Sequence, residues 1–110
     1  AKFQLNYLSS AAGTFVVPGT KLVPGKQVRL RLTAQDISLT LEAQKDTSIL
    51  NIFPALVDEL IPEDNAQLTV RLLINNLPVL ARITLKSAAN LQLQKNKSVF
   101  AQIKSVAVLA

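Results

Sequence analysis

The sequence predicts a small all-β binding domain. Short runs in which apolar residues alternate with polar ones favour half-buried strands rather than helices. The length of 110 residues fits one compact domain, or two very small modules that share a core. The alternation predicts strands over residues 28–33, 38–42, 67–74, 79–83 and 99–104.

Turn and breaker residues place the ends of these strands. Asn75-Asn76 lies between two alternating runs and tolerates positive φ, so it predicts a tight hairpin turn. Pro54 and Pro78 cannot donate to a ladder, so each is expected at a sheet edge, a strand start or a bulge. Ser87 is expected to cap one short helical turn over residues 88–91.

A faint internal repeat suggests two related β-modules. Residues 25–32 and 96–103 both begin with a turn residue followed by Lys, and then carry Val and two apolar residues at alternate positions. We therefore predict an N-terminal module over residues 1–46 and a C-terminal module over residues 47–110, although so short a repeat also arises by chance in strands.

The composition excludes several classes of function. The sequence has no Cys and no His, which excludes thiol chemistry, disulfides, His-based catalysis and zinc sites with those ligands. No apolar run approaches the roughly 20 residues of a membrane-spanning helix, and the N-terminus lacks the pattern of a signal peptide. The net charge of +5, spread evenly along the chain, favours an anionic partner or simply a basic surface.

Two candidate catalytic motifs do not fit their chemistry. Residues 19–27 resemble a phosphate-binding loop, but the glycine spacing is wrong, Gln27 replaces the Mg²⁺-binding hydroxyl and a strand is expected to follow. The carboxylates at 58–59 and 63–64 flank Pro62 and are expected in a solvated loop. We therefore predict no enzymatic activity, no metal site and no cofactor for this chain.

Hydroxyl groups at the ends of predicted elements form the remaining constellation. Thr47-Ser48 opens a strand, Thr84 and Ser87 bracket the helical turn, and Lys104-Ser105 ends the last strand. Hydroxyls, free backbone N–H groups and one Lys suit a tetrahedral dianion, which needs several converging donors. Taken singly, each Ser or Thr is better explained as a cap or turn former.

A resemblance to a known family favours the oxyanion interpretation. Residues 83–106 contain Ile-Thr-x-x-Ser, then Leu-x-Leu, a turn and Val-x-Ala-x-Ile-Lys-Ser, and resemble the molybdate-binding mop module. Residues 47–51 resemble the Ser-x-Arg-Asn opening of that module, and residues 30–39 resemble the transport-associated OB (TOBE) segment. The order is most similar to the C-terminal domain of the ATP-binding subunit of bacterial molybdate transporters.

The resemblance implies an OB-like small β-barrel of mop/TOBE type that forms a homodimer with oxyanion sites between subunits. One residue departs from the family motif: Leu50 stands where Arg is usual. The loss of a charge-assisted donor weakens binding by about 1.5–3 kcal/mol in typical cases. The implied ligands for the anion, with Asn51 as a ligand or a structural position, are Ser48, Asn51, Thr84, Ser87, Lys104 and Ser105.

The resulting hypothesis is a regulatory domain that senses cytoplasmic molybdate or tungstate. Its expected partners are the parent ATPase domain upstream and the transporter membrane subunit, which would hold it at the cytoplasmic face of the inner membrane. Two alternatives remain open. The domain could be a purely structural dimerisation module, or an OB domain that binds nucleic acid, for which the few scattered aromatic residues offer no obvious stacking platform.

Overall fold

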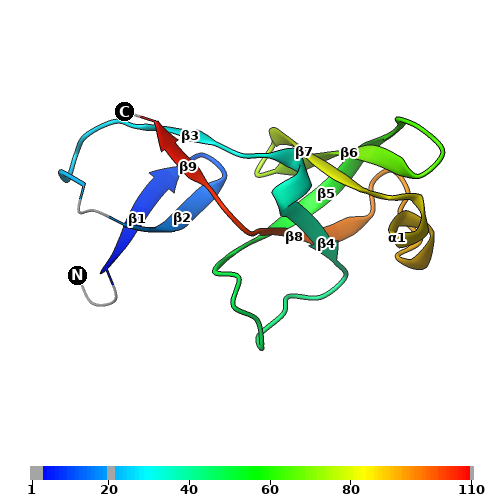
Figure 1. The fold of residues 1–110 in the computed structure, drawn as a ribbon, viewed down its shortest axis with the longest axis horizontal. Helices are drawn as coiled ribbons and strands as arrows, with labels where there is room; N and C mark the ends of the chain where they lie inside the picture. The colour runs from blue at the N-terminus through cyan, green and yellow to red at the C-terminus, as the bar shows by residue number, and fades with distance from the viewer. Residues whose placement is uncertain (1–3, 20–21, 110) are drawn as a thin grey trace.

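The fold was analysed in a computed structural model, which describes residues 4–19 and 22–109 (Figure 1). Its strands and short helices follow one another along the chain. They are β1 (Leu5–Ser10), β2 (Gly13–Pro18), β3 (Arg29–Arg31), the 3₁₀ turn η2 (Ala34–Asp36), β4 (Ile37–Thr40), β5 (Asn51–Pro62), β6 (Gln67–Ile74), β7 (Leu77–Thr84), α1 (Leu85–Asn90), β8 (Ser98–Ile103) and β9 (Ala107–Leu109).

The largest sheet has five strands in the order β4-β8-β5-β6-β7. All neighbouring strands are antiparallel, and the sheet curls so that its last strand, β7, also contacts β4 and η2. The prediction of an all-β, OB-like small barrel with one short helix is therefore confirmed. Its core consists of Phe15, Val17, Ile37, Leu39, Phe53, Ala55, Val57, Leu68, Val70, Leu72, Ile74, Ala81, Val99, Ala101 and Ile103.

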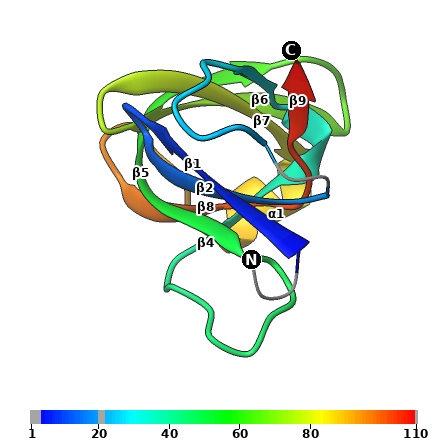
Figure 2. The same cartoon turned by 90° about the vertical axis from the view of Figure 1, so that its left-hand side faces the viewer.

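Two smaller sheets extend from this barrel. The hairpin β1-β2 forms one, and β3 pairs with β9 to form the other. Figure 2 shows the hairpin lying across one end of the barrel. The rings of Phe15 on β2 and Phe53 on β5 pack with their centroids 4.8 Å apart, which buries both of them. The hairpin is thus anchored to the barrel by apolar packing.

The two predicted modules share strands with each other. β4, from residues 1–46, pairs with β8, whereas β9, from residues 47–110, pairs with β3. Each half of the chain therefore contributes its last strand to a sheet of the other half. The division at residues 46 and 47 stays a prediction. The hairpin β1-β2 lies within the first half, whereas each of the other two sheets contains strands of both halves.

The predicted turns agree with the structure, but the helix cap does not. Asn75 and Asn76 join β6 to β7 with φ values of 53° and 69°. Helix α1 begins at Leu85, and its N-cap is Thr84 rather than Ser87. Thr84 takes this position because its β conformation lets its hydroxyl accept the Ser87 N–H.

Strand β5 was not among the alternating runs, because both of its faces carry apolar residues. Asn51, Phe53, Ala55 and Val57 are buried, whereas Ile52 and Leu56 between them are partly covered and Pro54 is exposed. Pro54 lies within β5 opposite Phe100, before the pairing of β5 with β6 begins. The proline therefore has no β6 residue opposite it, which is consistent with its expected place at a local edge.

Candidate functional site

Lys104 and Ser105 follow β8 and are exposed. Asp36, at the end of η2, holds this segment by two hydrogen bonds. The Lys104 N–H donates to the Asp36 carbonyl oxygen at 2.9 Å, and the Ser105 hydroxyl donates to Asp36 Oδ2 at 2.9 Å. A serine hydroxyl has one proton to donate. The Ser105 hydroxyl must therefore leave Asp36 before it can donate to a bound anion.

Asp36 was not predicted as a site residue. It lies 69 positions from Ser105 in the sequence, and no local pattern relates the two residues. Its nearness follows from the pairing of β4 with β8, in which Ile37 lies opposite Ile103. Sequence reasoning could have found this contact only by predicting the register in which β4 pairs with β8.

Thr84 and Ser87 lie together at the start of α1, and both are exposed. The Ser87 N–H donates to Thr84 Oγ1 at 3.0 Å, and the Thr84 hydroxyl donates to Ser87 Oγ at 2.9 Å. The Ser87 hydroxyl proton is not used in either of these bonds. This pair therefore presents one hydroxyl donor to the surface.

Asn51 and Ser48 have different surroundings, although only two residues separate them. The Asn51 side chain is 7% exposed, accepts the Val16 N–H at 2.7 Å and donates to the Val16 carbonyl at 2.9 Å. Ser48 lies on the surface before β5, and Leu50 beside it is 60% exposed. In this chain Asn51 has a structural contact, and its role toward a ligand stays a prediction.

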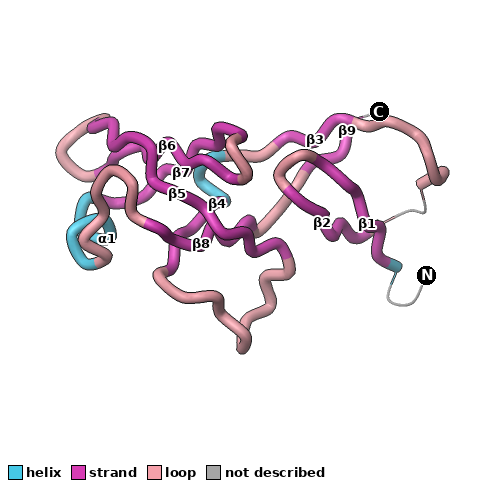
Figure 3. The backbone as a smooth tube through the Cα atoms, turned by 180° about the vertical axis from the view of Figure 1, so that it is seen from behind, coloured by secondary structure: helices cyan, strands magenta, loops and turns pink. Residues whose placement is uncertain are grey.

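The strand register separates the six predicted residues into two groups. Ile103 lies opposite Asn51 at the start of β5, so Lys104 and Ser105 lie near that end of the sheet. Thr84 pairs with Gln67, beyond the last residues of β5. Figures 1 and 3 likewise show α1 at the end of the barrel away from β9. Within one chain, the predicted residues do not form a single closed site.

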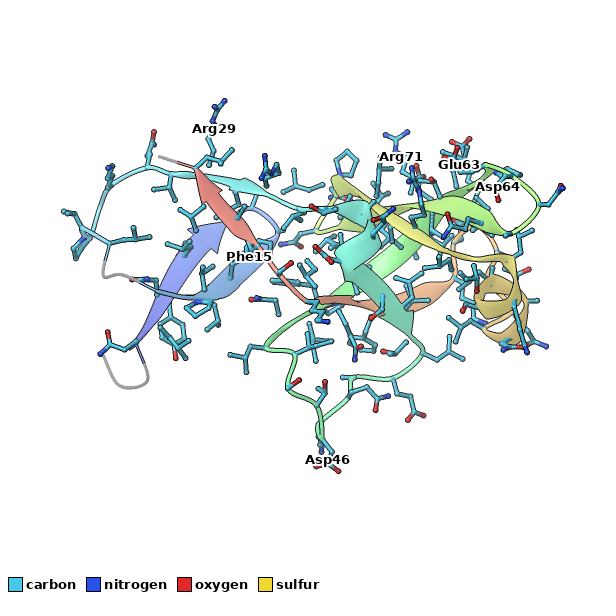
Figure 4. All side chains as sticks on the ribbon, viewed as in Figure 1. Phe15, Arg29, Asp46, Glu63, Asp64 and Arg71 are labelled. Atoms are coloured by element: carbon cyan, nitrogen blue, oxygen red, sulfur yellow. The ribbon has the colours of Figure 1, made fainter. Side chains whose placement is uncertain are left out.

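The predicted carboxylate cluster is divided between a strand and a turn. Asp58 and Glu59 belong to β5, which corrects their expected place in a loop, and Asp58 forms an ion pair with Arg71 at 3.4 Å. They were misplaced because a β-bulge between Val57 and Glu59 interrupts the alternation of the strand. Figure 4 labels Arg71 on β6 and Glu63 and Asp64 in the turn that follows β5.

Asp64 forms the turn between β5 and β6. Its Oδ1 accepts the N–H groups of Ala66 at 2.7 Å and Gln67 at 2.8 Å, and these bonds lower the pKa of the Asp64 carboxyl from 3.8. Such a carboxylate is a turn former. In the described part of the chain, no three acidic residues come together in a group that could hold a metal ion.

The curled antiparallel sheet, with polar residues at its ends, defines an OB-like binding domain. A solved structure with this fold is the cytoplasmic molybdate-binding protein ModG with molybdate bound, with a TM-score of 0.75 and 22% identity. The match covers 81% of this chain and 65% of ModG. Residues 47–110 match the TOBE domain model, and the chain belongs to the TOBE domain family.

Sequence relatives extend the match into the N-terminal half. The chain is 47% identical over 94 residues to the molybdenum import ATP-binding protein ModC of Albidiferax ferrireducens, and 44% identical over 107 residues to ModC of Pseudomonas aeruginosa. These matches cover 86% and 88% of the chain but only 26% and 30% of the relatives. The chain thus spans less than a third of either relative.

Among the described residues, no helix is long and apolar enough to cross a membrane.

Proposed function

We propose that this chain is an oxyanion-binding regulatory domain that takes molybdate or tungstate. The main support for this proposal is the match of most of the chain to ModC, a molybdenum import ATP-binding protein. The surface hydroxyls and Lys104 add to it. A tetrahedral dianion suits these groups because hydroxyls and N–H groups supply donors with little full charge. The domain binds and does not catalyse, and it uses no metal or cofactor.

The anion lies between two copies of the domain in this proposal. The separation of Thr84 and Ser87 from Lys104 and Ser105 within one chain supports this arrangement, because residues from opposite ends of the barrel meet only across an interface. A two-fold dimer whose subunits lie side by side and antiparallel places one end of each chain against the other end of its partner. The exposed Leu50 offers apolar surface near Ser48 for such a contact.

Regulation follows from the preference of the anion for one arrangement of the two copies. Bound molybdate raises the population of the arrangement that it prefers. The parent ATPase subunit responds because it is linked to this domain. The domain then acts at the cytoplasmic face of the inner membrane, beside the transporter membrane subunit. The absence of Arg at position 50 leaves Lys104 as the cation at the site and predicts modest affinity.

Calorimetric titration of molybdate into the purified protein tests the proposal. We expect Lys104→Ala to weaken binding about 10- to 100-fold, as the loss of a charge-assisted hydrogen bond of about 1.5–3 kcal/mol requires. Lys26→Ala is the matched control, because it removes the same charge from a surface beside β1. Equal affinities of the two variants would remove Lys104 from the site. An intact dimer that does not bind millimolar molybdate would favour the structural dimerisation alternative.

The nucleic-acid alternative receives little support from the aromatic side chains. Phe15 and Phe53 are buried against each other and cannot stack on bases. Among the described residues, Tyr7 is the exposed aromatic side chain, at 66%, and a single ring does not form a stacking platform for successive bases. Salt-sensitive retention of an oligonucleotide that molybdate does not compete away would restore this alternative.

A further inference from the structure

A hollow of about 990 Å³ lies along one edge of the N-terminal hairpin. Residues 5–9 of β1 line one side of it, and residues 22–29, which lead into β3, line the other. Strand β1 and a loop that contains the Pro24-Gly25 turn thus face the same space. Lys26 and Arg29 are the charged residues of its lining, and Figure 4 shows Arg29 projecting outward from β3.

Strand β1 borders the hollow through residues 5–9, and β3 borders it through Arg29. Each of these strands has one edge that is paired and one that is not. In the described part of the chain, β1 pairs with β2 only, and β3 pairs with β9 only. Ser10 and Gly13 form the closing pair of a two-residue hairpin turn, and the ladder alternates from there. This alternation turns the N–H groups of Tyr7 and Ser9 away from β2. They are the groups with which a further strand would pair.

The C-terminal half of the chain shows which strand belongs in this space. The strand order of the large sheet is β4-β8-β5-β6-β7. The corresponding order around the hollow is β9-β3, then a position without a strand, and then β1-β2. Hairpins β1-β2 and β6-β7 both close with two-residue turns, and the repeat seen in the sequence relates β3 to β8. Strands β4 and β9 are then equivalent too. The position without a strand is that of β5, which lies between β8 and β6 and is antiparallel to both.

We propose that an extended strand fills this hollow, antiparallel to β1 and β3, and that it is the segment immediately before residue 1 in a longer chain. Strand β5 joins β6 through only residues 63–66, so the equivalent strand precedes β1 by a similarly short turn. The curated relatives are more than three times as long as this chain, which provides the required sequence. This inference does not depend on the oxyanion proposal.

The lining specifies the character of the strand. Leu8, Leu22 and Val28 are half-buried, so alternate residues of the strand are apolar and cover them. Lys26 and Arg29, with no acidic residue among the lining residues, favour acidic or polar side chains near the rim. The segment therefore alternates between apolar and acidic or polar residues, as an edge-completing strand requires.

Amide hydrogen exchange in the full parent chain tests the proposal. We expect the Tyr7 and Ser9 amides to be protected to the same degree as amides of β6, and to lose this protection when the twelve residues before residue 1, the length of β5, are deleted. The β6 amides, as internal controls, stay protected in both proteins. Rapid exchange of Tyr7 and Ser9 in the parent chain overturns the proposal, as does protection that depends on protein concentration, because a second copy would then supply the strand.

A proline substitution gives a second test that does not depend on the deletion. Tyr7→Pro removes an N–H that β2 does not use, so it disturbs only pairing within the hollow. In the parent chain, we expect Tyr7→Pro to lower strongly the urea concentration at the unfolding midpoint. In the 110-residue chain, the midpoint of Tyr7→Pro should lie close to that of Tyr7→Ala. Equal losses in the two chains overturn the proposal. If the 110-residue chain does not fold, the exchange of Tyr7 and Ser9 in the parent chain decides.

Discussion

The side chain of Asn51 forms hydrogen bonds with both backbone polar groups of Val16, at 2.7 and 2.9 Å. The Asn51 amide thus satisfies both backbone groups of Val16, as a residue of a neighbouring strand would in a ladder. Val16 lies on the hairpin and Asn51 at the start of β5, so the contact joins two sheets that share no backbone ladder. It fixes the hairpin where Phe15 packs on Phe53.

Replacement of Asn51 should therefore destabilise the fold. Asn51→Ala leaves a part-buried N–H and C=O of Val16 without their side-chain partner, and we expect a loss of about 1–3 kcal/mol in the free energy of unfolding. Ser48→Ala, at an exposed position nearby, should change it by less than about 0.5 kcal/mol. Urea unfolding followed by circular dichroism measures both. Similar midpoints for the two variants would show that the contact does not hold the hairpin.

Gly13 should resist substitution because Phe53 lies against it. Its φ is +138°, and a Cβ atom there would lie 2.8 Å from Phe53 Cε1. Gly25, with φ +83° and open space around it, is the matched control for backbone strain. We expect Gly25→Ala to cost about 1–2 kcal/mol and Gly13→Ala about 1–3 kcal/mol more, from overpacking.

A double substitution separates the two causes. Phe53→Leu should recover part of the loss in the Gly13→Ala background, because a smaller side chain relieves the contact. The unfolding free energies of the single and double variants give the coupling directly. Additive losses would show that backbone conformation alone sets the cost at Gly13.

The cap of α1 should distinguish Thr84 from Ser87. Thr84→Ala removes the acceptor for the Ser87 N–H, and we expect a loss of about 0.5–2 kcal/mol. Ser87→Ala keeps that bond and should cost less than about 0.5 kcal/mol. Thermal unfolding of both variants, with Thr84→Ser as a conservative control, measures the difference. A larger loss for Ser87→Ala would place the cap at Ser87 after all.

Asp64 should make stability depend on pH in the acid range. Its folded pKa is lowered from 3.8 by bonds to the Ala66 and Gln67 N–H groups, so the folded state favours the carboxylate. The contribution is fully present above 3.8 and is lost as the pH falls through the lower folded pKa. Asp64→Asn should flatten this part of the stability profile, measured by urea unfolding from neutral pH to about pH 2. An unchanged profile would assign the acid dependence to other carboxylates.

The alternation predicted β6, whose two faces differ, and missed β5, whose two faces both carry apolar residues. Leu68, Val70 and Leu72 alternate with less apolar neighbours in β6, and that strand was predicted with its bounds. In β5 the apolar Ile52 and Leu56 lie between core residues, so no alternation marks it. Period-2 patterns report a difference in burial between faces, not strand conformation itself.

The candidate site shows a related limit. The residue types at positions 84, 87, 104 and 105 pointed to anion chemistry, because hydroxyls and Lys carry that signal locally. Their division into two groups, and the bond from Ser105 to Asp36, depend on which strands pair and in what register. A hairpin turn can fix the register of strands that are neighbours in the sequence, but β4 and β8 lie too far apart for a turn to do so.

The exchange of β4 and β9 between the halves also constrains how the chain folds during synthesis. Strand β3 leaves the ribosome well before its partner β9 is made, and β4 must likewise wait for β8. Contacts of such long sequence separation form slowly. The nascent chain therefore exposes unpaired strand edges until residue 109 is free, and during that interval a neighbouring polypeptide can compete for them.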